Sequence, residues 1–342
     1  MTAHGTPDSP ATLLLDLIAS HRITAVIYVA ARLGIADLLA ERPRTTEELA
    51  QSSGADERSL HRLLRALTAL GICQQLDESR FGLTALGANL AGDAKHSVKV
   101  WALFEGELLA GTWRGLLDSI RTGKTGAELA GSDDSFELMA RNPAHVQVFN
   151  EAMLAFTRLI VADVLAAYDF SGITRLMDVG GGYGQLLCAI LHAYPDLRGV
   201  VFDLPRCAAG ATRHLDEAGL SDRAEFTPGS FFASVPAGAD AIIMKSIIHD
   251  WNDERSIAIL TNCRRALPTG GRLLLVERLM PERPEVTAHD RLVTLSALNM
   301  LRGPGGCERT EREYRELLRA GGFAMTRALP AGRFAVVEAN VA

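Results

Sequence analysis

His249 is the residue of this sequence best suited to catalysis, and it lies four residues after an expected strand over 239–245, which contains the apolar run 241–244. Two acids are candidate partners: Glu277 ends another apolar run, and Glu308 lies in a glycine-rich turn. A lone histidine is more often a packing residue. If one carboxylate accepts the Nδ1 hydrogen, however, it fixes the tautomer, raises the basicity of the ring and leaves Nε2 to take a proton. A phenol with a pKa of about 10 needs such a base to react as a nucleophile near pH 7.

A glycine-rich turn, D-V-G-G-G-Y-G-Q, begins at Asp178 and ends at Gln185, between a predicted strand and a predicted helix. Gly180, Gly182 and Gly184 allow tight turning and close approach of the backbone to a ligand. The dinucleotide pattern G-x-G-x-x-G/A requires glycine or alanine where this chain has Gln185. The turn therefore favours a small ligand other than a dinucleotide.

Two acids near this turn narrow the choice of ligand. Asp178 lies directly ahead of the glycines and suits a positive group, and Asp203, about 23 residues after Gly180, ends the next apolar run, followed by Leu204. A carboxylate at that place can accept hydrogen bonds from both hydroxyls of a ribose. Each feature alone has a bland explanation, as a turn or a helix cap. Together they predict S-adenosylmethionine, which carries both an ammonium group and a ribose.

The chain has 342 residues, enough for two domains, and its pattern changes near residue 174. Up to about 166 it reads as helical, and beyond that short apolar runs alternate with helical stretches, which is typical of a mostly parallel sheet. We therefore predict an α/β protein. The expected parts are a winged-helix domain over 1–100, a helical connector over 101–168 and a Rossmann-like domain over 169–342.

The N-terminal part has the order of a winged helix: helix, turn, helix and then a hairpin around residues 77–79. Its second helix carries Arg58, His61, Arg62 and Arg65, which is compatible with binding DNA. Residues 1–100 nevertheless hold 10 Lys or Arg against 11 Asp or Glu, whereas DNA-binding domains usually have a basic face. We favour packing or dimerisation over nucleic-acid binding.

Composition excludes several other classes of protein. The formal net charge is −6, with 48% hydrophobic and 22% charged residues, which argues against polyanion binding and against disorder. Uninterrupted apolar stretches such as Ala25 to Ala31 are shorter than a membrane span, and the N-terminus has no secretory signal pattern. The five cysteines are scattered, so we expect neither a disulfide framework nor a metal site. A cytoplasmic protein without a membrane partner is expected.

A long helix predicted over 143–168 places Phe149, Met153 and Phe156 on one apolar stripe. Such a stripe is usually core, but this one leads into the first strand and could wall a pocket between the domains. We expect these three residues, together with Asn299 and Met300, to contact an acceptor.

The whole set of motifs resembles the S-adenosylmethionine-dependent O-methyltransferases of the plant caffeate and bacterial polyketide-tailoring type. The resemblance covers nearly the whole chain and implies a homodimer formed by the winged-helix domain and a small hydroxylated, aromatic acceptor. Matched by motif, it implies that His249 is the general base, Glu277 and Glu308 flank it, and Asp250 lies near the substrate. It places Asp203 on the ribose and Lys245 near the cofactor. The expected cofactor site comprises Asp178, Gly180, Gly182, Asp203, Leu204, Ser230, Phe231 and Lys245.

Two positions depart from that family pattern. Ser230 stands where the family usually has an aspartate near the adenine, and Ser246 stands where plant members often have tryptophan. Loss of the carboxylate at 230 is expected to weaken cofactor binding.

Two other functions remain open at this point. The same scaffold hosts relatives that use the cofactor for hydroxylation, decarboxylation or pericyclic steps without methyl transfer. A winged-helix regulator that senses the cofactor is the alternative without catalysis. Retention of His249, Glu277 and Glu308 favours O-methylation.

Overall fold

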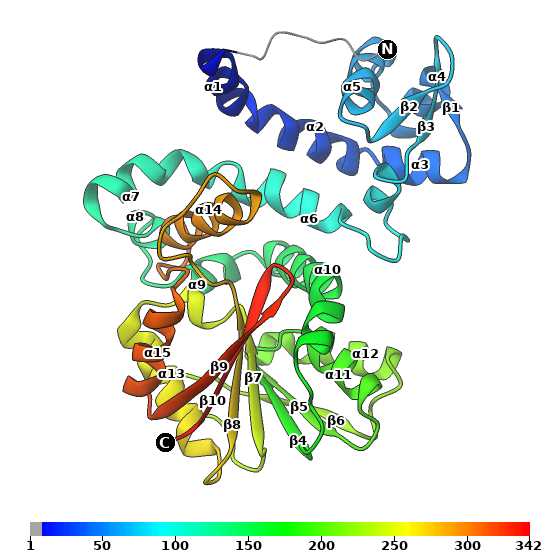
Figure 1. Ribbon diagram of the computed structural model, residues 1–342. Coiled ribbons are helices and arrows are strands. Elements are labelled where there is room, and N and C mark those ends of the chain that lie inside the picture. Colours follow the sequence, from blue (N-terminus) through cyan, green and yellow to red (C-terminus); the bar gives the residue numbers. More distant parts are fainter. Residues whose placement is uncertain (1–8) are drawn as a thin grey trace. The chain divides into compact units, whose positions relative to one another are not determined.

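The computed structural model describes residues 9–342, which form two compact units, the first ending at Gly111 and the second comprising Thr112–Ala342 (Figure 1). Each unit is described by itself.

The first unit is mainly helical, with a small antiparallel sheet in the order β1-β3-β2. Its helices α4 and α5 and the hairpin of β2 and β3 follow one another as in a winged helix, as predicted. The elements are α1 (Pro10–Ala19), α2 (His21–Arg32), α3 (Ile35–Glu41), β1 (Arg44–Thr45), α4 (Thr46–Ser53), α5 (Glu57–Ala69), β2 (Cys73–Gln75), β3 (Arg80–Leu83), α6 (Lys99–Leu103) and a π-helix (Phe104–Leu109).

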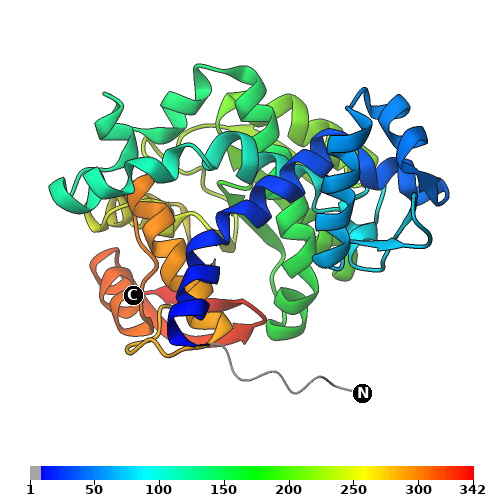
Figure 2. The ribbon, with the colours of Figure 1, turned by 90° about the horizontal axis from the view of Figure 1, so that it is seen from above.

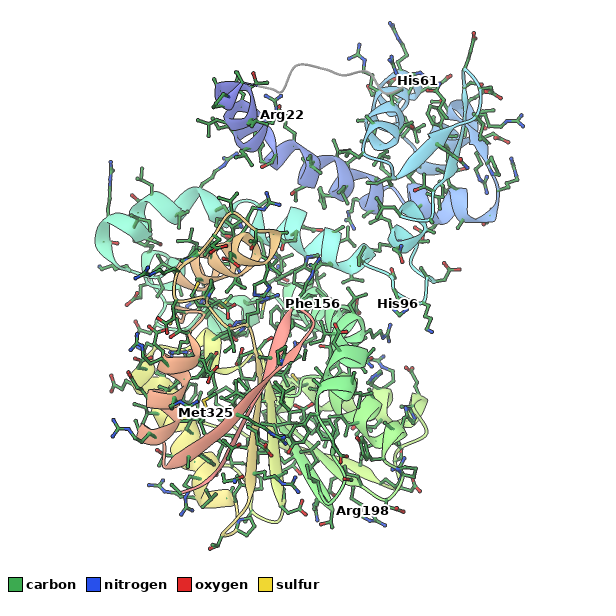
Figure 3. All side chains as sticks on the ribbon, viewed as in Figure 1. Arg22, His61, His96, Phe156, Arg198 and Met325 are labelled. Carbon is green, nitrogen blue, oxygen red and sulfur yellow. The ribbon has the colours of Figure 1, made fainter. Side chains whose placement is uncertain are left out.

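Local signals explain where these helices begin and end. Thr45 caps α4 by accepting from the backbone N–H of Glu48, whose carboxylate in turn accepts from the Thr45 N–H, a capping box. Gly54 and Gly71, with φ of 71° each, end α4 and follow α5, since glycine adopts the left-handed conformation that stops a helix. His61, on α5, is bound internally: its Nδ1 lies 3.1 Å from the Thr46 hydroxyl and its ring packs edge-on against Phe81. His61 is therefore a packing residue of this unit (Figure 3).

The N-terminal helices expose an unusual amount of apolar surface. None of the residues of α1 is buried, and its leucines and isoleucine are 53% to 64% exposed. Figure 2 shows α1 and α2 as consecutive helices that meet near Ser20. Among the described residues, the helical stretch Pro10–Arg32 is long enough and apolar enough to cross a membrane, by length and composition only. Counting only uninterrupted apolar runs missed this property, although length and composition alone are weak evidence for a span.

The second unit contains a seven-stranded sheet with helices on both faces (Figure 1). Its elements are α7 (Leu116–Thr122), α8 (Gly126–Leu129), α9 (Ser135–Ala140), α10 (Pro143–Ala167), β4 (Arg175–Val179), α11 (Gln185–Ala193), β5 (Arg198–Asp203), α12 (Ala208–Glu217), β6 (Ala224–Pro228), β7 (Ala241–Lys245), a 3-10 turn η5 (Ile248–Asp250), α13 (Asp253–Ala266), β8 (Arg272–Glu277), α14 (Ala288–Arg302), α15 (Glu311–Ala320), β9 (Phe323–Ala331) and β10 (Phe334–Val341).

The sheet has the order β6-β5-β4-β7-β8-β10-β9, with the first five strands parallel and β10 antiparallel to both neighbours. Strand residues alternate between two hydrophobic cores: Leu176 and Ile243 pack with α10 and α11, whereas Met177 and Ile242 pack with α13 and α15. Both faces are thus buried, which explains the continuous apolar runs in the sequence. The Rossmann-like fold class and the long helix α10 are confirmed. The sequence analysis did not anticipate β9 and β10.

The chain order reverses between β4 and β7, because β5 lies on one side of β4 and β7 on the other. The carboxyl ends of β4, β5, β7 and β8 therefore meet at one edge, which is where open α/β sheets bind ligands. Asp178, Asp203, Lys245 and Glu277 are all at or next to these strand ends.

The exposed apolar face of α1 predicts that two chains associate. We expect light scattering at micromolar concentration to give twice the mass of one chain, because burying this face against a second copy removes it from water. The double substitution Leu14→Glu with Ile18→Glu should shift the protein towards monomer. Leu76→Glu, which charges an exposed leucine elsewhere in the unit, is the matched control. A monomeric wild type would contradict the assignment of this face.

Candidate active site

The glycine-rich turn after β4 is built so that side chains would not fit. Gly180 and Gly184 have φ of 74° and 81°, and a Cβ at these positions would lie 2.5 Å from Ile247 Cδ1 and 2.7 Å from Val201 Cγ2. Gly182 has φ of 58°, but a Cβ there would meet nothing within 4 Å. The turn therefore packs tightly against the sheet on one side and leaves Gly182 beside open space, as a ligand cradle requires.

Asp203, at the end of β5, is tied to this turn. Its Oδ2 accepts the N–H of Gly182 at 2.7 Å, and its Oδ1 accepts the N–H of Leu204 at 2.6 Å. Burial raises the pKa of the Asp203 carboxyl, while these two backbone N–H groups oppose the shift. The structure thus brings together Asp203, Leu204 and Gly182, which the sequence placed in one cofactor site.

The buried Asp178 and the half-buried Lys245 carry side chains of opposite charge type at the ends of the neighbouring strands β4 and β7. Burial raises the pKa of Asp178 to about 7, and the positive charge of Lys245 opposes this shift. Burial also lowers the pKa of Lys245 to about 8, against the attraction of Glu277. Groups whose pKa values lie this close to neutral pH can change protonation when a charged ligand binds beside them.

Ser230 and Phe231 lie on the segment after β6. The Ser230 hydroxyl accepts the N–H of Phe232 at 3.3 Å, and Phe231 contacts the ring of Trp251 with centroids 6.2 Å apart. Phe231 is also within 3.6 Å of the place where a Cβ on Gly180 would lie. Phe231 is therefore next to the glycine turn, as expected for a residue of the cofactor site.

The chain turns sharply between Lys245 and His249. Ser246 has a φ of 54°, the one positive value at a non-glycine position among residues 9–342. For a residue with a Cβ atom, this left-handed conformation has a free-energy cost of about 1 kcal/mol. Such residues are common at functional sites. After it, the N–H groups of Ile247 and Ile248 both donate to Oε1 of Glu277, at 3.1 and 2.9 Å. Glu277 therefore holds the backbone of the turn that carries His249.

Glu308 holds the side chain of His249. The distance from His249 Nδ1 to Glu308 Oε1 is 3.0 Å, whereas Glu277 Oε2 lies 3.9 Å from the same nitrogen. Asp250 approaches the other ring nitrogen, with Oδ1 3.4 Å from Nε2. His249 is only 6% exposed, and Glu277 and Glu308 are buried. The expected convergence of Glu277 and Glu308 on His249 is present, with different tasks for the two acids.

Charges dominate the titration of His249. Burial lowers the pKa of this imidazole, but the carboxylates of Glu308, Glu277 and Asp250 outweigh burial and raise the pKa to about 9. Burial raises the pKa of Asp250 to about 7, against the pull of His249. Burial also raises the pKa of Glu277, whereas His249 and the Ser296 hydroxyl keep the pKa of Glu308 low despite its burial. Glu308 is therefore the ionised partner of His249.

Arg309 directly follows Glu308, and no role was predicted for it from the sequence. Its guanidinium is 3% exposed and donates to the carbonyl oxygens of Ile248 at 3.1 Å and Trp251 at 2.8 Å, on either side of His249. Gly306 allows the same segment to approach, since a Cβ there would lie 2.1 Å from the His249 carbonyl oxygen. The direct succession Glu308-Arg309 was the available signal: Glu308 binds the side chain of His249, and Arg309 binds the carbonyl groups of Ile248 and Trp251.

Arg278 and Ser296 were also missed. Arg278 follows Glu277 at the end of β8, and its NH1 donates to the Ser296 hydroxyl at 3.2 Å and lies 3.6 Å from Glu308 Oε1. No pattern in the sequence connects Ser296, on α14, with Glu308, because only the packing of α14 brings them together.

The residues expected to contact an acceptor lie in different surroundings. Phe156 packs against Phe334 with centroids 5.8 Å apart, and Lys245 Nζ lies 5.6 Å from its ring (Figure 3). Phe149 packs edge-on against Phe136 at 5.9 Å. On α14, the Asn299 side chain accepts from Arg302, and Met300 is 7% exposed. The half-buried Met153 lies on α10, four residues from Phe149. Their contact with an acceptor stays a prediction.

His249, Glu277 and Glu308 place one ligand atom each within 4.8 Å of one another, close enough to hold a metal ion. Two cations argue against that use, because the guanidinium of Arg278 and the ammonium of Lys245 already act on these carboxylates. A metal would also compete for His249 Nδ1 and Glu308 Oε1, which bind each other. We interpret the cluster as a site that holds a proton.

The fold and the site together define a protein of the Rossmann-like class, with a glycine-rich turn and acids at the carboxyl ends of β4 and β5 and a buried histidine–carboxylate pair that includes the turn after β7. Residues 113–324 match the O-methyltransferase domain, and residues 15–93 match the O-methyltransferase dimerisation domain. The phenazine O-methyltransferase PhzM of Lysobacter antibioticus is 41% identical over 330 residues, 96% of each chain. The mitomycin biosynthesis 6-O-methyltransferase of Streptomyces lavendulae is 36% identical over 342 residues, 97% of each chain.

The chain is also similar to a solved structure that contains a cofactor and an acceptor. NcsB1, an O-methyltransferase from neocarzinostatin biosynthesis in complex with S-adenosylmethionine and 2-hydroxy-5-methyl naphthoic acid, matches with a TM-score of 0.79 and 33% identity over 100% of both chains. The chain belongs to the S-adenosylmethionine-dependent O-methyltransferase family, of the type that modifies bacterial secondary metabolites. It binds S-adenosylmethionine and methylates small-molecule secondary metabolites, and its dimerisation domain implies a homodimer.

Asp203→Ala tests the cofactor site. If Asp203 binds the ribose, the substitution removes two charge-assisted hydrogen bonds, each worth about 1.5 to 3 kcal/mol. We expect calorimetry with S-adenosylhomocysteine to give a dissociation constant at least about ten-fold higher. Asp222→Ala, which removes an exposed acid of the same unit, is the control. Unchanged affinity in Asp203→Ala would remove the ribose assignment.

Ser230→Asp tests the departure from the family pattern. A carboxylate at this position can accept from the adenine amino group, so we expect tighter binding of S-adenosylhomocysteine in calorimetry. Ser234→Asp adds the same charge four residues away on an exposed side chain and should leave affinity unchanged. Equal or weaker binding in Ser230→Asp would mean that other contacts, such as Phe231, position the adenine.

Proposed function

We propose that this enzyme methylates a phenolic hydroxyl of an aromatic small molecule, with His249 as general base. The observation that carries the proposal is the buried pair of His249 Nδ1 and Glu308 Oε1, 3.0 Å apart, beside the strand ends that form the cofactor site. A histidine with one nitrogen bound to a carboxylate has the other nitrogen available for the acceptor proton.

The residues around the glycine turn fit the cofactor by their chemistry. S-adenosylmethionine supplies an electrophilic methyl group on a positively charged sulfonium. In the proposal Asp203 accepts from the ribose hydroxyls, Asp178 faces the ammonium group and Lys245 lies near the cofactor. Gly180, Gly182 and Leu204 shape the surface, and Ser230 and Phe231 lie at the adenine.

His249 has a defined proton path in this proposal. Its Nδ1–H donates to Glu308, so that Nε2 receives the hydroxyl proton, and Asp250 Oδ1, 3.4 Å away, stabilises the resulting imidazolium. With the pKa raised to about 9, most of this histidine is protonated at pH 7 before the ligands bind. The basic fraction therefore increases with pH, and a nearby sulfonium favours it further.

The class of acceptor is inferred by analogy with the relatives. The names of two relatives refer to a phenazine and to mitomycin biosynthesis, and NcsB1 is in complex with 2-hydroxy-5-methyl naphthoic acid. By this analogy we infer a planar, hydroxylated aromatic acceptor, walled by Phe149, Met153, Phe156, Asn299 and Met300. The five cysteines are free thiols, four of them buried, which supports our proposal of a reducing, cytoplasmic location.

Transfer of radiolabelled methyl from the cofactor to phenolic metabolites is the direct test of this function. A labelled product supports it. Tight cofactor binding with an acceptor that is altered but never methylated would instead support the non-methylating alternative. A regulator would bind duplex DNA with an affinity that falls as salt rises.

His249→Ala separates binding from chemistry. We expect turnover to fall by roughly 10² to 10⁴ while the affinity for S-adenosylhomocysteine changes little, because only the proton acceptor is lost. In the wild type, log kcat/KM should rise with pH up to near the pKa of His249, about 9, since the neutral imidazole is the active form. His192→Ala, which removes an exposed histidine of α11, should match the wild type. Full activity of His249→Ala on a phenol of ordinary pKa would show that positioning alone drives the reaction.

A further inference from the structure

Arg278 is a buried cation that the proposed reaction does not use. Its side chain is 11% exposed, and its guanidinium carbon lies 4.7 Å from the ring centre of Phe334 and 5.5 Å from that of Phe156. These two aromatic rings, from β10 and α10, hold the guanidinium in place. Its Nε is buried and has no hydrogen-bond partner within the described part of the chain. A buried charge kept with an unsatisfied donor is costly and needs a reason.

The reason lies in the contacts of Arg278 on the side of Glu308. NH1 of Arg278 is 3.6 Å from Glu308 Oε1 and donates to the Ser296 hydroxyl at 3.2 Å. The Ser296 hydroxyl donates to the same Oε1 at 2.6 Å. Glu308 Oε1 therefore receives Ser296 and His249 together, with the charge of Arg278 directly behind them.

The carboxylate of Glu308 therefore interacts with His249 on one side and with Ser296 and Arg278 on the other. The carboxylate stabilises the imidazolium of His249, and every other cation or donor on the carboxylate weakens that stabilisation. Arg278 and Ser296 also favour the ionised form of Glu308, which keeps Oε1 as the acceptor for Nδ1–H. They thus fix the orientation of His249 and limit how strongly it holds its proton.

We propose that Arg278 and Ser296 are positioning residues of the base: through Glu308 they fix the orientation of His249 and make its proton easier to lose. The inference rests on the proposed role of His249.

Other charged groups act on this cluster from the surrounding elements. Lys245 lies on β7, Asp250 on η5 and Glu277 on β8, and Tyr314 on α15 and Arg333 before β10 face Glu308 and Arg278. Asp250 and Glu277 raise the pKa of His249. The charge of Arg278 also acts on Lys245 and Glu277, whereas Ser296→Ala changes no charge, so a shift of the His249 titration in Ser296→Ala reports on the contacts of Glu308 alone.

The test compares Arg278→Gln, Arg278→Lys and Ser296→Ala in the full-length protein. NMR titration of the His249 ring without ligand should show its pKa raised by about half a unit or more in Arg278→Gln, and less in Ser296→Ala. The acidic limb of the pH dependence of kcat/KM should move to higher pH by the same amount. Arg278→Lys, which keeps the charge, should restore most of the shift. Glu308→Gln should move the limb in the opposite direction, because it removes the charge that favours imidazolium.

Arg327→Gln is the matched control. Arg327 also pairs with a glutamate, Glu338 at 2.7 Å, and lies 5.8 Å from the ring centre of Tyr168, but it is on β9 and belongs to another cluster. The His249 titration should not change in this variant.

Two results would overturn the proposal. If kcat and thermal stability fall while the pKa of His249 stays the same, Arg278 is a packing residue. If the KM for the acceptor rises while the acidic limb of the pH dependence stays in place, Arg278 is an acceptor-binding residue. If Arg278→Gln does not fold, Ser296→Ala decides the question by the same titration. Full methylation by His249→Ala would refute the proposed base, whereas the NMR titration tests the link to Arg278 independently of turnover.

Discussion

The hydrogen bond between His249 Nδ1 and Glu308 Oε1 is the interaction on which the rest of the site depends. It joins the end of β7 to the segment before α15, and both partners are almost completely buried. A buried imidazole without a carboxylate would stay neutral, and a buried carboxylate without a cation would take up a proton. Together they hold a proton at a place that is almost completely buried.

Much of the surrounding structure serves this pair. Glu277 binds the N–H groups of Ile247 and Ile248, Arg309 binds the carbonyl groups of Ile248 and Trp251, and Gly306 permits the close approach of the two segments. The strained backbone at Ser246 begins the turn. These contacts fix the path of the backbone around His249. The position of its ring is therefore determined by the fold.

The parallel sheet explains why cofactor and base are neighbours. Because β4, β5, β7 and β8 run in one direction, their carboxyl ends bring Asp178, Asp203, Lys245 and Glu277 to a single edge. Asp178 and Glu277 are buried and Asp203 and Lys245 are half-buried, and burial moves the pKa of Asp178 to about 7 and that of Lys245 to about 8. The same burial that makes these charges costly makes them responsive to a charged ligand.

The sequence by itself determined the class of fold and the glycine turn, because apolar periodicity and glycine positions follow from local backbone geometry. It also named His249, Glu277 and Glu308 as candidate partners, by their resemblance to family motifs and on the condition that the fold brings them together. It did not predict β9 and β10, and it counted apolar runs in a way that missed the apolar character of Pro10–Arg32. Only the tertiary structure decided that Glu277 binds backbone while Glu308 binds the ring, and that Ser296 and Arg278 share Glu308. Those contacts join residues from separate elements, so their geometry depends on packing, which no pattern along one chain contains.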